Sequence, residues 1–159
     1  MSKITLQTVV HILLATVWYA LPIFIGIYVD FLFGLPKISF AFDYIFGIFL
    51  IILGAFAVYK GTADLIKYGK GSPHPYFPPK KFVNEGIYKK VRHPIYLGWI
   101  LLTFGSAFYF QSISILEAAF MIIIFLYFYV NSEEKNLEKV FGKKFIEYKK
   151  KVPAFIPKF

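Results

Sequence analysis

Residues 95–130 read IYLGWILLTFGSAFYFQSISILEAAFMIIIFLYFYV, and this apolar stretch decides the fold of the chain. Its single charged residue is Glu117. A membrane-crossing helix needs about 20 mostly apolar residues, so the stretch is too long for one crossing and fits two short ones. Its most polar point is FQSIS, residues 110–114. The stretch therefore predicts a helical hairpin with its tip at 110–114, and partial re-entry into the bilayer is the alternative.

Two more apolar segments precede the hairpin, at residues 6–29 and 40–59. The connector between them contains Gly34 and Pro36, which are typical of a turn. The whole chain is 58% hydrophobic, above the roughly 45–50% of soluble domains. We therefore predict an all-α integral membrane protein with about four transmembrane helices.

Positive charge concentrates on one side of the expected bilayer. The chain has 18 lysines and arginines and a net charge of +9. Eight of these basic residues fall within 60–92 and eight lie beyond residue 130, whereas Lys37 alone falls in a loop on the opposite side. Because cytoplasmic loops carry the excess of Lys and Arg, we expect both termini and the loop between the second and third helices to face the cytoplasm. We expect these basic residues to interact with lipid headgroups of the bilayer and not with nucleic acid.

These segments form one predicted domain, residues 1–159. It comprises two N-terminal membrane helices (1–59), a cytoplasmic loop (60–94), the hairpin (95–130) and a cytoplasmic tail (131–159). Apolar residues of the tail recur at spacings of three and four, which indicates an amphipathic C-terminal helix; they are Leu137, Phe141, Phe145 and Tyr148. The chain has no cysteine, which excludes disulfides and thiolate chemistry, and its three scattered histidines predict no metal site.

The hairpin is entered through RHPIYLG, residues 92–98. Arg92 suits a lipid headgroup contact, and Pro94 suits the first position of a helix, where its missing N–H costs nothing. This membrane-entry interpretation leaves His93 unexplained, because histidine adds little as an anchor. A functional role for His93 is the alternative.

A second polar element, NSEEKNLEKVFGKKFIEY at residues 131–148, follows the hairpin directly. Asn131 or Ser132 suits a helix cap, and Glu133 and Glu134 would be favourable in the first turn of that new helix. Two carboxylates at the membrane end of a span also suit a cationic ligand, because charges at such depth are costly and tend to be functional. The sequence leaves both interpretations open.

The motifs follow one another in a specific order: Gly-x-Tyr, Arg-His-Pro-x-Tyr-x-Gly, an apolar hairpin, Glu-Glu-x-x-Leu, Phe-Gly-x-x-Phe-x-x-Tyr and Val-Pro. This order, over residues 80–157, resembles the isoprenylcysteine carboxyl methyltransferase family and its relatives, the phospholipid N-methyltransferases. The resemblance implies a membrane methyltransferase that uses S-adenosylmethionine and acts on a small lipophilic methyl acceptor.

The resemblance also implies a cytoplasm-facing cofactor site built from the loop, the end of the hairpin and the tail. It assigns cofactor binding to Lys80, Lys81, Phe82, Val83, Tyr88, His93, Pro94, Ile95, Tyr96 and Glu133. A histidine or a backbone N–H suits the cofactor carboxylate, and a glutamate suits its ammonium group or ribose hydroxyls. Tyrosine rings suit its adenine or its sulfonium.

The resemblance leaves the methyl acceptor open. A carboxylate or thiolate acceptor needs no general base, whereas an amine acceptor has to be neutral, with Glu134 or His93 as candidate bases. Arg92 is a further catalytic candidate.

Prenylcysteine methyltransferases have an arginine near the end of the last membrane helix that helps hold the substrate carboxylate. The matching position here is Tyr129, and no Arg or Lys lies between Gly98 and Glu133. This departure disfavours a prenylcysteine carboxylate, and phospholipid N-methyl transfer and thiol S-methyl transfer are the alternatives. A non-enzymatic basic membrane scaffold is the alternative from another class of protein. The sequence leaves the oligomeric state open.

Overall fold

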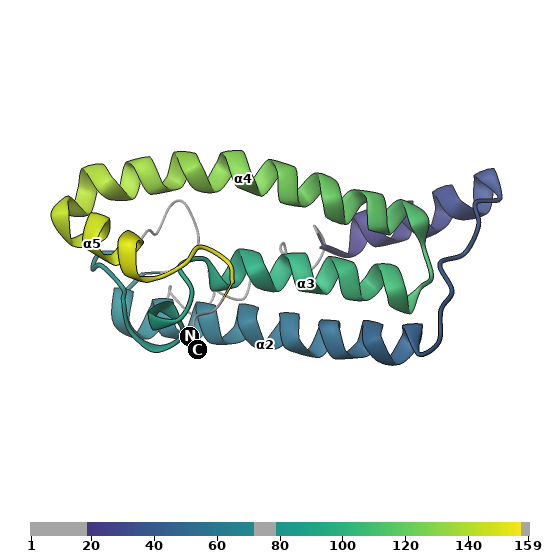
Figure 1. Cartoon of the computed structure of the whole chain (residues 1–159), viewed down its shortest axis with the longest axis horizontal. Coiled ribbons are helices and arrows are strands. Elements are labelled where there is room, and N and C mark those ends of the chain that lie inside the picture. Colours follow the sequence, from purple (N-terminus) through teal and green to yellow (C-terminus); the bar gives the residue numbers. More distant parts are fainter. Residues whose placement is uncertain (1–18, 72–78, 157–159) are drawn as a thin grey trace, which may run out of the picture.

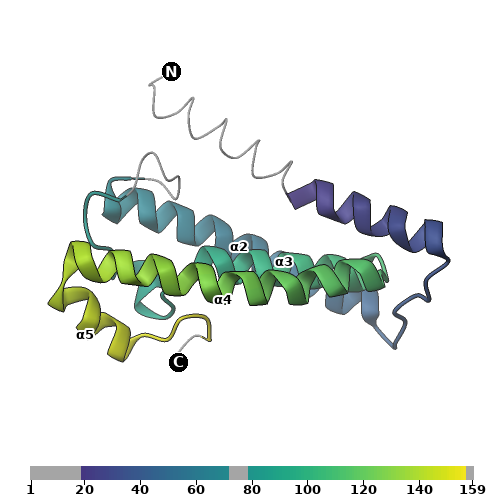
Figure 2. The ribbon, with the colours of Figure 1, turned by 90° about the horizontal axis from the view of Figure 1, so that it is seen from above.

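The computed structural model describes residues 19–71 and 79–156 of the 159-residue chain. Within these ranges all regular structure is helical: Tyr19–Phe33, α2 (Asp43–Gly69), the 3-10 turn η1 (Gly86–Lys89), α3 (Pro94–Tyr109), α4 (Ile113–Phe141) and α5 (Lys143–Lys151). Figure 1 and Figure 2 show α2, α3 and α4 running along the long axis of the molecule, and α3 packs against both α2 and α4. The predicted helix start at residue 6 lies outside the described residues, as do His11 and His74.

Two of these helices, α2 and α4, are long and apolar enough to cross a membrane, and Tyr19–Phe33 and α3 are shorter apolar helices. Large aromatic side chains face outward from the bundle, among them Phe24, Phe49 and Phe125. Soluble monomers rarely expose a contiguous apolar surface of this kind, because water disfavours it. The outward aromatic surface therefore suits a lipid environment.

Glycines bring α2 and α3 into backbone contact. A Cβ added to Gly54 would lie 2.7 Å from the carbonyl oxygen of Gly98, and one added to Gly47 would lie 2.8 Å from that of Gly105. In lipid, where no hydrophobic effect drives helices together, small residues stabilise helix pairs by letting their backbones approach closely. The glycines thus make α2 and α3 one tightly packed antiparallel unit.

The hairpin turns within the predicted tip. Helix α3 ends at Tyr109, and the Ser112 hydroxyl caps α4 by accepting a hydrogen bond from the Ile115 N–H at 3.1 Å. The Asp30 carboxylate, in helix Tyr19–Phe33, accepts a second bond at this end from the Ser114 N–H at 3.1 Å. The first described helix is thereby attached to the start of α4.

The second helix is longer than predicted, because α2 ends at Gly69 and not at residue 59. Its extra turns are stabilised by the Lys60–Asp64 ion pair of 2.8 Å, one helical turn apart. Lys70 then adopts a left-handed conformation that ends the helix. The residues expected at the start of the cytoplasmic loop are therefore helical.

The interpretation of Asn131 or Ser132 as the cap of a new helix is wrong, because α4 runs without interruption from Ile113 to Phe141. Asn131 and Ser132 lie inside the helix, where the capping signal read from the sequence has no role. The chain turns instead at Gly142, whose φ of 56° ends α4.

The shorter α5 then packs its apolar side under the end of the bundle. Phe145, Tyr148 and Val152 form a buried cluster, against which Phe82, Leu137 and Phe141 pack. The apolar residues predicted to lie on one face of a tail helix therefore do pack together in one cluster. They come from two helices, α4 and α5. At the same end of the molecule lie the last turns of α2, the segment at 79–93 and the polar part of α4 (Figure 1).

Candidate functional site

Glu134 is the centre of the polar cluster at this end of the bundle. Its side chain is 3% exposed. One carboxylate oxygen, Oε1, accepts from Arg92 Nε at 2.9 Å and contacts His93 Nε2 at 3.0 Å, and the other, Oε2, binds Lys149 Nζ at 2.8 Å. The cluster joins the chain before α3, the polar part of α4, and α5.

Backbone hydrogen bonds hold the entry to α3 against the tail. The Arg92 N–H donates to the Pro153 carbonyl at 2.9 Å, and the His93 N–H donates to the Ala154 carbonyl at 3.1 Å. The Arg92 guanidinium also donates to the carbonyls of Lys149, at 3.0 Å, and Val152. Through Nε and Nη1, the Arg92 guanidinium thus connects the tail to Glu134.

The environment of Glu134 sets its protonation. Glu134 lies beyond residue 130, where the apolar part of α4 ends. Burial favours the neutral carboxyl, but the hydrogen bonds from His93, Lys149 and Arg92 outweigh burial and lower the pKa of Glu134 to about 2. The group is a paired carboxylate at neutral pH.

His93 lies between this paired carboxylate and a second one, Glu133. Its side chain is 7% exposed, and its Nδ1 atom lies 3.7 Å from Glu133 Oε2. The Tyr96 ring stacks on the imidazole with centroids 5.6 Å apart, and Phe155 of the tail contacts it at 5.9 Å. Glu133 Oε2 is buried and makes no hydrogen bond of ordinary geometry, although the Tyr96 phenol lies close enough to interact with the same carboxylate. A buried carboxylate oxygen without a well-placed donor is costly, so this atom is a candidate contact for a ligand.

The structure places the other residues assigned to cofactor binding in two different environments. Pro94 is buried in the first turn of α3, beside His93. Val83 and Tyr88 form an apolar cluster with Leu65, against which Ile95 packs. The Tyr88 carbonyl accepts from the Tyr148 hydroxyl at 2.6 Å, and burial raises the pKa of both phenols.

Residues 80–82 lie along a groove beneath α5. Their backbone turns back onto α2, because the N–H groups of Lys80 and Lys81 donate to the Gly69 carbonyl at 2.9 and 3.2 Å. The groove has a volume of about 840 Å³, and neither His93 nor Glu133 lines it. The structure therefore brings together Arg92, His93, Tyr96, Glu133 and Glu134, and places Lys80, Lys81 and Phe82 in a separate groove.

Two contributors to the site were not predicted. Lys149 binds Glu134, and Phe155 contacts His93. Lys149 belongs to the run Lys149–Lys151, within which no sequence signal distinguishes one lysine from the next. For the segment around Phe155, the preceding Val-Pro motif was the sequence signal for a defined position.

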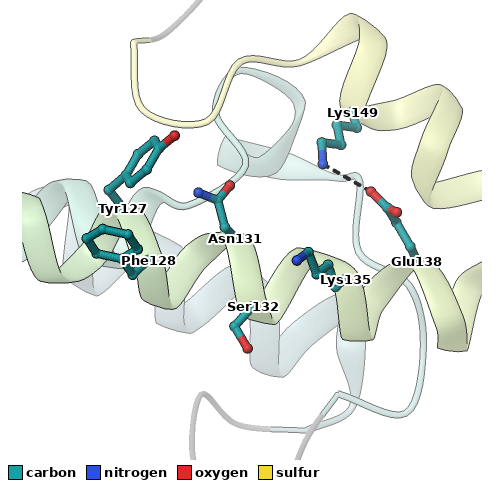
Figure 3. Close-up of a pocket in the computed structure, with 7 residues that line it drawn as sticks. All are labelled: Tyr127, Phe128, Asn131, Ser132, Lys135, Glu138 and Lys149. Carbon is teal, nitrogen blue, oxygen red and sulfur yellow. Dashed lines mark hydrogen bonds and ion pairs between the residues drawn. The ribbon is translucent and has the colours of Figure 1, made fainter.

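A smaller cavity of about 500 Å³ lies on another flank of α4 (Figure 3). The helical repeat of 3.6 residues places Tyr127, Asn131 and Glu138 roughly opposite Tyr129 and Glu133 around the helix axis. Lys149 reaches Glu138 across this cavity at 3.0 Å. The cavity is thus distinct from the cluster around His93; it is lined by Tyr127, Phe128, Asn131, Ser132, Lys135, Glu138 and Lys149.

Known proteins resemble this chain in sequence and in fold. The family model described as Phospholipid methyltransferase matches residues 42–144, well over half of the chain. Protein-S-isoprenylcysteine O-methyltransferase B of Arabidopsis thaliana is 30% identical over 123 residues, which cover 70% of this chain and 58% of that protein. Methanethiol S-methyltransferase of Crocosphaera subtropica is 32% identical over 81 residues, which cover 51% of this chain and 31% of that protein. The chain thus spans from about a third to somewhat over half of the length of these relatives.

The fold is that of a membrane-embedded helical protein. The structure of the eukaryotic intramembrane Ras methyltransferase ICMT (isoprenylcysteine carboxyl methyltransferase) matches with a TM-score of 0.64 and 19% sequence identity, over 90% of this chain and 52% of that chain. At this identity the likeness concerns the fold alone. The family match over α2, α3 and α4 shows that the chain belongs to the phospholipid methyltransferase family, with an isoprenylcysteine methyltransferase-like fold.

Proposed function

We propose that this chain is an integral membrane methyltransferase that uses S-adenosylmethionine and acts on a lipophilic acceptor. The observation that carries the proposal is the buried Oε2 atom of Glu133, which makes no hydrogen bond of ordinary geometry beside His93 and Tyr96, within the range that the family model matches. S-Adenosylmethionine, when bound, supplies an electrophilic methyl group on a sulfonium sulfur.

The residues around His93 fit this cofactor. S-Adenosylmethionine carries an ammonium, a carboxylate and a sulfonium, so its net charge is positive. Glu133 Oε2 would accept from its ammonium group or ribose hydroxyls. The Tyr96 ring offers an aromatic face of the kind that attracts a sulfonium. In this proposal His93, Tyr96 and Glu133 are the principal cofactor contacts, and Pro94, Ile95, Val83 and Tyr88 shape the protein around them.

Glu134 and Arg92 have a positioning role in the proposal. Glu134 is paired with three side chains and has a lowered pKa, which makes it a poor general base. Glu134 binds the Nε2 atom of His93, and this contact orients the imidazole so that its Nδ1 atom faces Glu133. Arg92 fixes the tail that brings Phe155 against the same imidazole.

The methyl acceptor in this proposal is lipophilic and not anionic. Tyr129 meets Tyr96 edge to face at 5.8 Å and stacks on Phe125 at 5.9 Å, which makes the wall beside the cluster aromatic. This wall offers a carboxylate acceptor no cation of its own, because the sequence has no Lys or Arg between Gly98 and Glu133, and the nearby Arg92 and Lys149 are already paired with Glu134. A thiol or a neutral amine suits such a wall. Transfer of labelled methyl groups to long-chain thiols, amines and carboxylates tests this choice, and preferred transfer to the carboxylate contradicts it.

Cofactor binding by purified protein tests the proposal itself. We expect calorimetry in detergent to give a micromolar dissociation constant for S-adenosylhomocysteine, roughly −8 kcal/mol. Glu133→Gln should weaken binding by about 1–3 kcal/mol, since it removes the charge from the contact, which is roughly 5- to 150-fold.

Glu138→Gln is the matched control for this experiment. Glu138 lies on the same helix and binds Lys149 at a partly exposed site, so its loss should leave cofactor affinity unchanged. Absence of heat and of thermal stabilisation at millimolar ligand, with folded wild-type protein, would overturn the proposed function.

A further inference from the structure

We propose that the groove between residues 80–89 and α5 binds the phosphate headgroup of an anionic phospholipid. We call it the basic groove, and its volume is about 840 Å³. Five lysines line it, against one carboxylate, that of Glu147; they are Lys80, Lys81, Lys89, Lys144 and Lys151. The inference concerns a site apart from the His93 cluster and does not depend on the proposed function.

The lysines of the basic groove have few partners within the protein. Among the described residues, Lys89 forms an ion pair with Glu85 at 2.8 Å, whereas Lys80, Lys81, Lys144 and Lys151 form none. Elsewhere on the same end of the molecule, Lys60 and Lys149 are paired with carboxylates. Unpaired ammonium groups around one concave surface repel each other, and an anion placed among them relieves that repulsion.

The packing of the chain fixes the two sides of the basic groove. On one side, the Gly69 carbonyl holds the backbone of Lys80 and Lys81. On the other, α5 is held by the buried Phe145 and by the Tyr148 hydroxyl bond to the Tyr88 carbonyl. Phe82 joins the sides, because its ring meets Phe141, Phe145 and Tyr148 at 5.4, 6.1 and 5.2 Å. The lysines are thus presented from a prearranged scaffold.

The chemistry of the basic groove favours an anionic lipid over the cofactor. S-Adenosylmethionine has a net positive charge, so five ammonium groups disfavour it. The walls formed by Phe82, Phe141 and Tyr148 suit the less polar part of a phospholipid next to its phosphate. The groove lies at the end of the spans where α2 and α4 become polar, which is the level of lipid headgroups, and lysines near an anionic surface contribute roughly fivefold each in affinity.

The test is native mass spectrometry of the full chain in detergent, titrated separately with phosphatidylglycerol and phosphatidylcholine. We expect wild type to bind phosphatidylglycerol preferentially. The triple change Lys81→Gln, Lys144→Gln and Lys151→Gln should weaken that binding at least tenfold and leave phosphatidylcholine binding unchanged. The corresponding change of the three lysines to arginine keeps the charge and should retain binding.

The matched control removes the same charge outside the basic groove, by Lys139→Gln, Lys143→Gln and Lys150→Gln. These three lysines are exposed, and none of them lines the groove. We expect the control to bind phosphatidylglycerol within about twofold of wild type. Equal losses in the two glutamine triples would show a diffuse charge effect and overturn the proposal. Equal binding of the two lipids, or displacement of phosphatidylglycerol by millimolar inorganic phosphate, would overturn it as well.

Discussion

At the scale of single residues, the candidate site depends most directly on Glu134, because Arg92, His93 and Lys149 all end on its two carboxylate oxygens. Replacing it by glutamine keeps the shape and removes the charge, which leaves the nearly buried Arg92 without its carboxylate. Removing one partner of a buried ion pair costs about 3–5 kcal/mol. We therefore expect Glu134→Gln to lower the thermal unfolding temperature in detergent clearly. Glu138→Gln removes a partly exposed ion pair, so it should lower the free energy of unfolding by less than about 1 kcal/mol.

The lowered pKa of Glu134 also predicts how stability responds to acid. The pKa is 4.5 in the unfolded reference and about 2 in the folded chain. A depressed carboxyl pKa contributes stability that is complete above about pH 4.5 and is lost as the pH falls toward about 2. The neighbours Arg92 and Lys149 stay protonated throughout this range. Unfolding temperatures of wild type and Glu134→Gln should therefore converge below about pH 4.5, and a gap that stays constant would contradict the role assigned to Glu134.

The sequence motif predicted the important neighbours of His93, but not their complete set. His93 and Glu133 lie together although some forty residues separate them in the sequence. The reason is that α4 runs antiparallel to α3, so that its polar part lies beside the start of α3. Lys149 was not predictable, since its position depends on the turn at Gly142 that folds α5 back onto the bundle. The same turn places α5, with Lys144 and Lys151, beside Lys81 along the basic groove.

At the scale of helices, the hairpin tip was predictable and the ends of α2 and α4 were not. The tip is marked by polar residues inside an apolar run, which is a local signal. Asn131 and Ser132 carried an equally local signal for a helix start, but the helix continues past them, because nothing in their backbone conformation breaks it before Gly142. A capping pattern in the sequence thus shows where a helix can begin. It does not show whether the same residues lie inside a longer helix.

The close approach of α2 and α3 leads to a prediction at this scale. Gly54→Leu would place a side chain where the Gly98 carbonyl and the Leu102 N–H lie within 2.8 Å of a Cβ. Overpacking of this kind typically costs about 1–3 kcal/mol, and here it would also separate the two helices. Ala55→Leu changes the neighbouring exposed position and should be nearly neutral in lipid. Equal unfolding temperatures for the two variants would show that the helices do not need this contact.

At the scale of the whole molecule, the distribution of charge predicts how the bundle sits in the bilayer. We propose four crossings, with the His93 cluster and α5 on the cytoplasmic side. Because the chain lacks cysteine, Lys37→Cys and Lys150→Cys introduce single labels in the exposed connector before α2 and in α5. An impermeant maleimide should label position 37 only from outside and position 150 only from the cytoplasm. Labelling of both from one side would rule out this topology.

The glycine contacts between α2 and α3 raise a question of register. Gly47, Gly54 and Gly61 recur every seven residues, as do Gly98 and Gly105, and seven residues of helix span about 10.5 Å. If α3 slid along α2 by that length, glycines of the two helices would again lie opposite each other. Close packing alone therefore does not distinguish the observed alignment from the shifted one.

Two aspartates, one near each end of α2, determine which of these alignments forms. Asp43 accepts from the Gln111 side chain just after α3, at 2.6 Å, and Asp64 accepts from the Ile87 N–H just before it, at 2.8 Å. Either slide would separate Asp43 from the Gln111 side chain and Asp64 from the Ile87 N–H, while Asp64 would keep only its partner within α2, Lys60. The glycines therefore let α2 and α3 meet, and the two aspartates fix the position of α3, with His93 at its start, along the axis of α2.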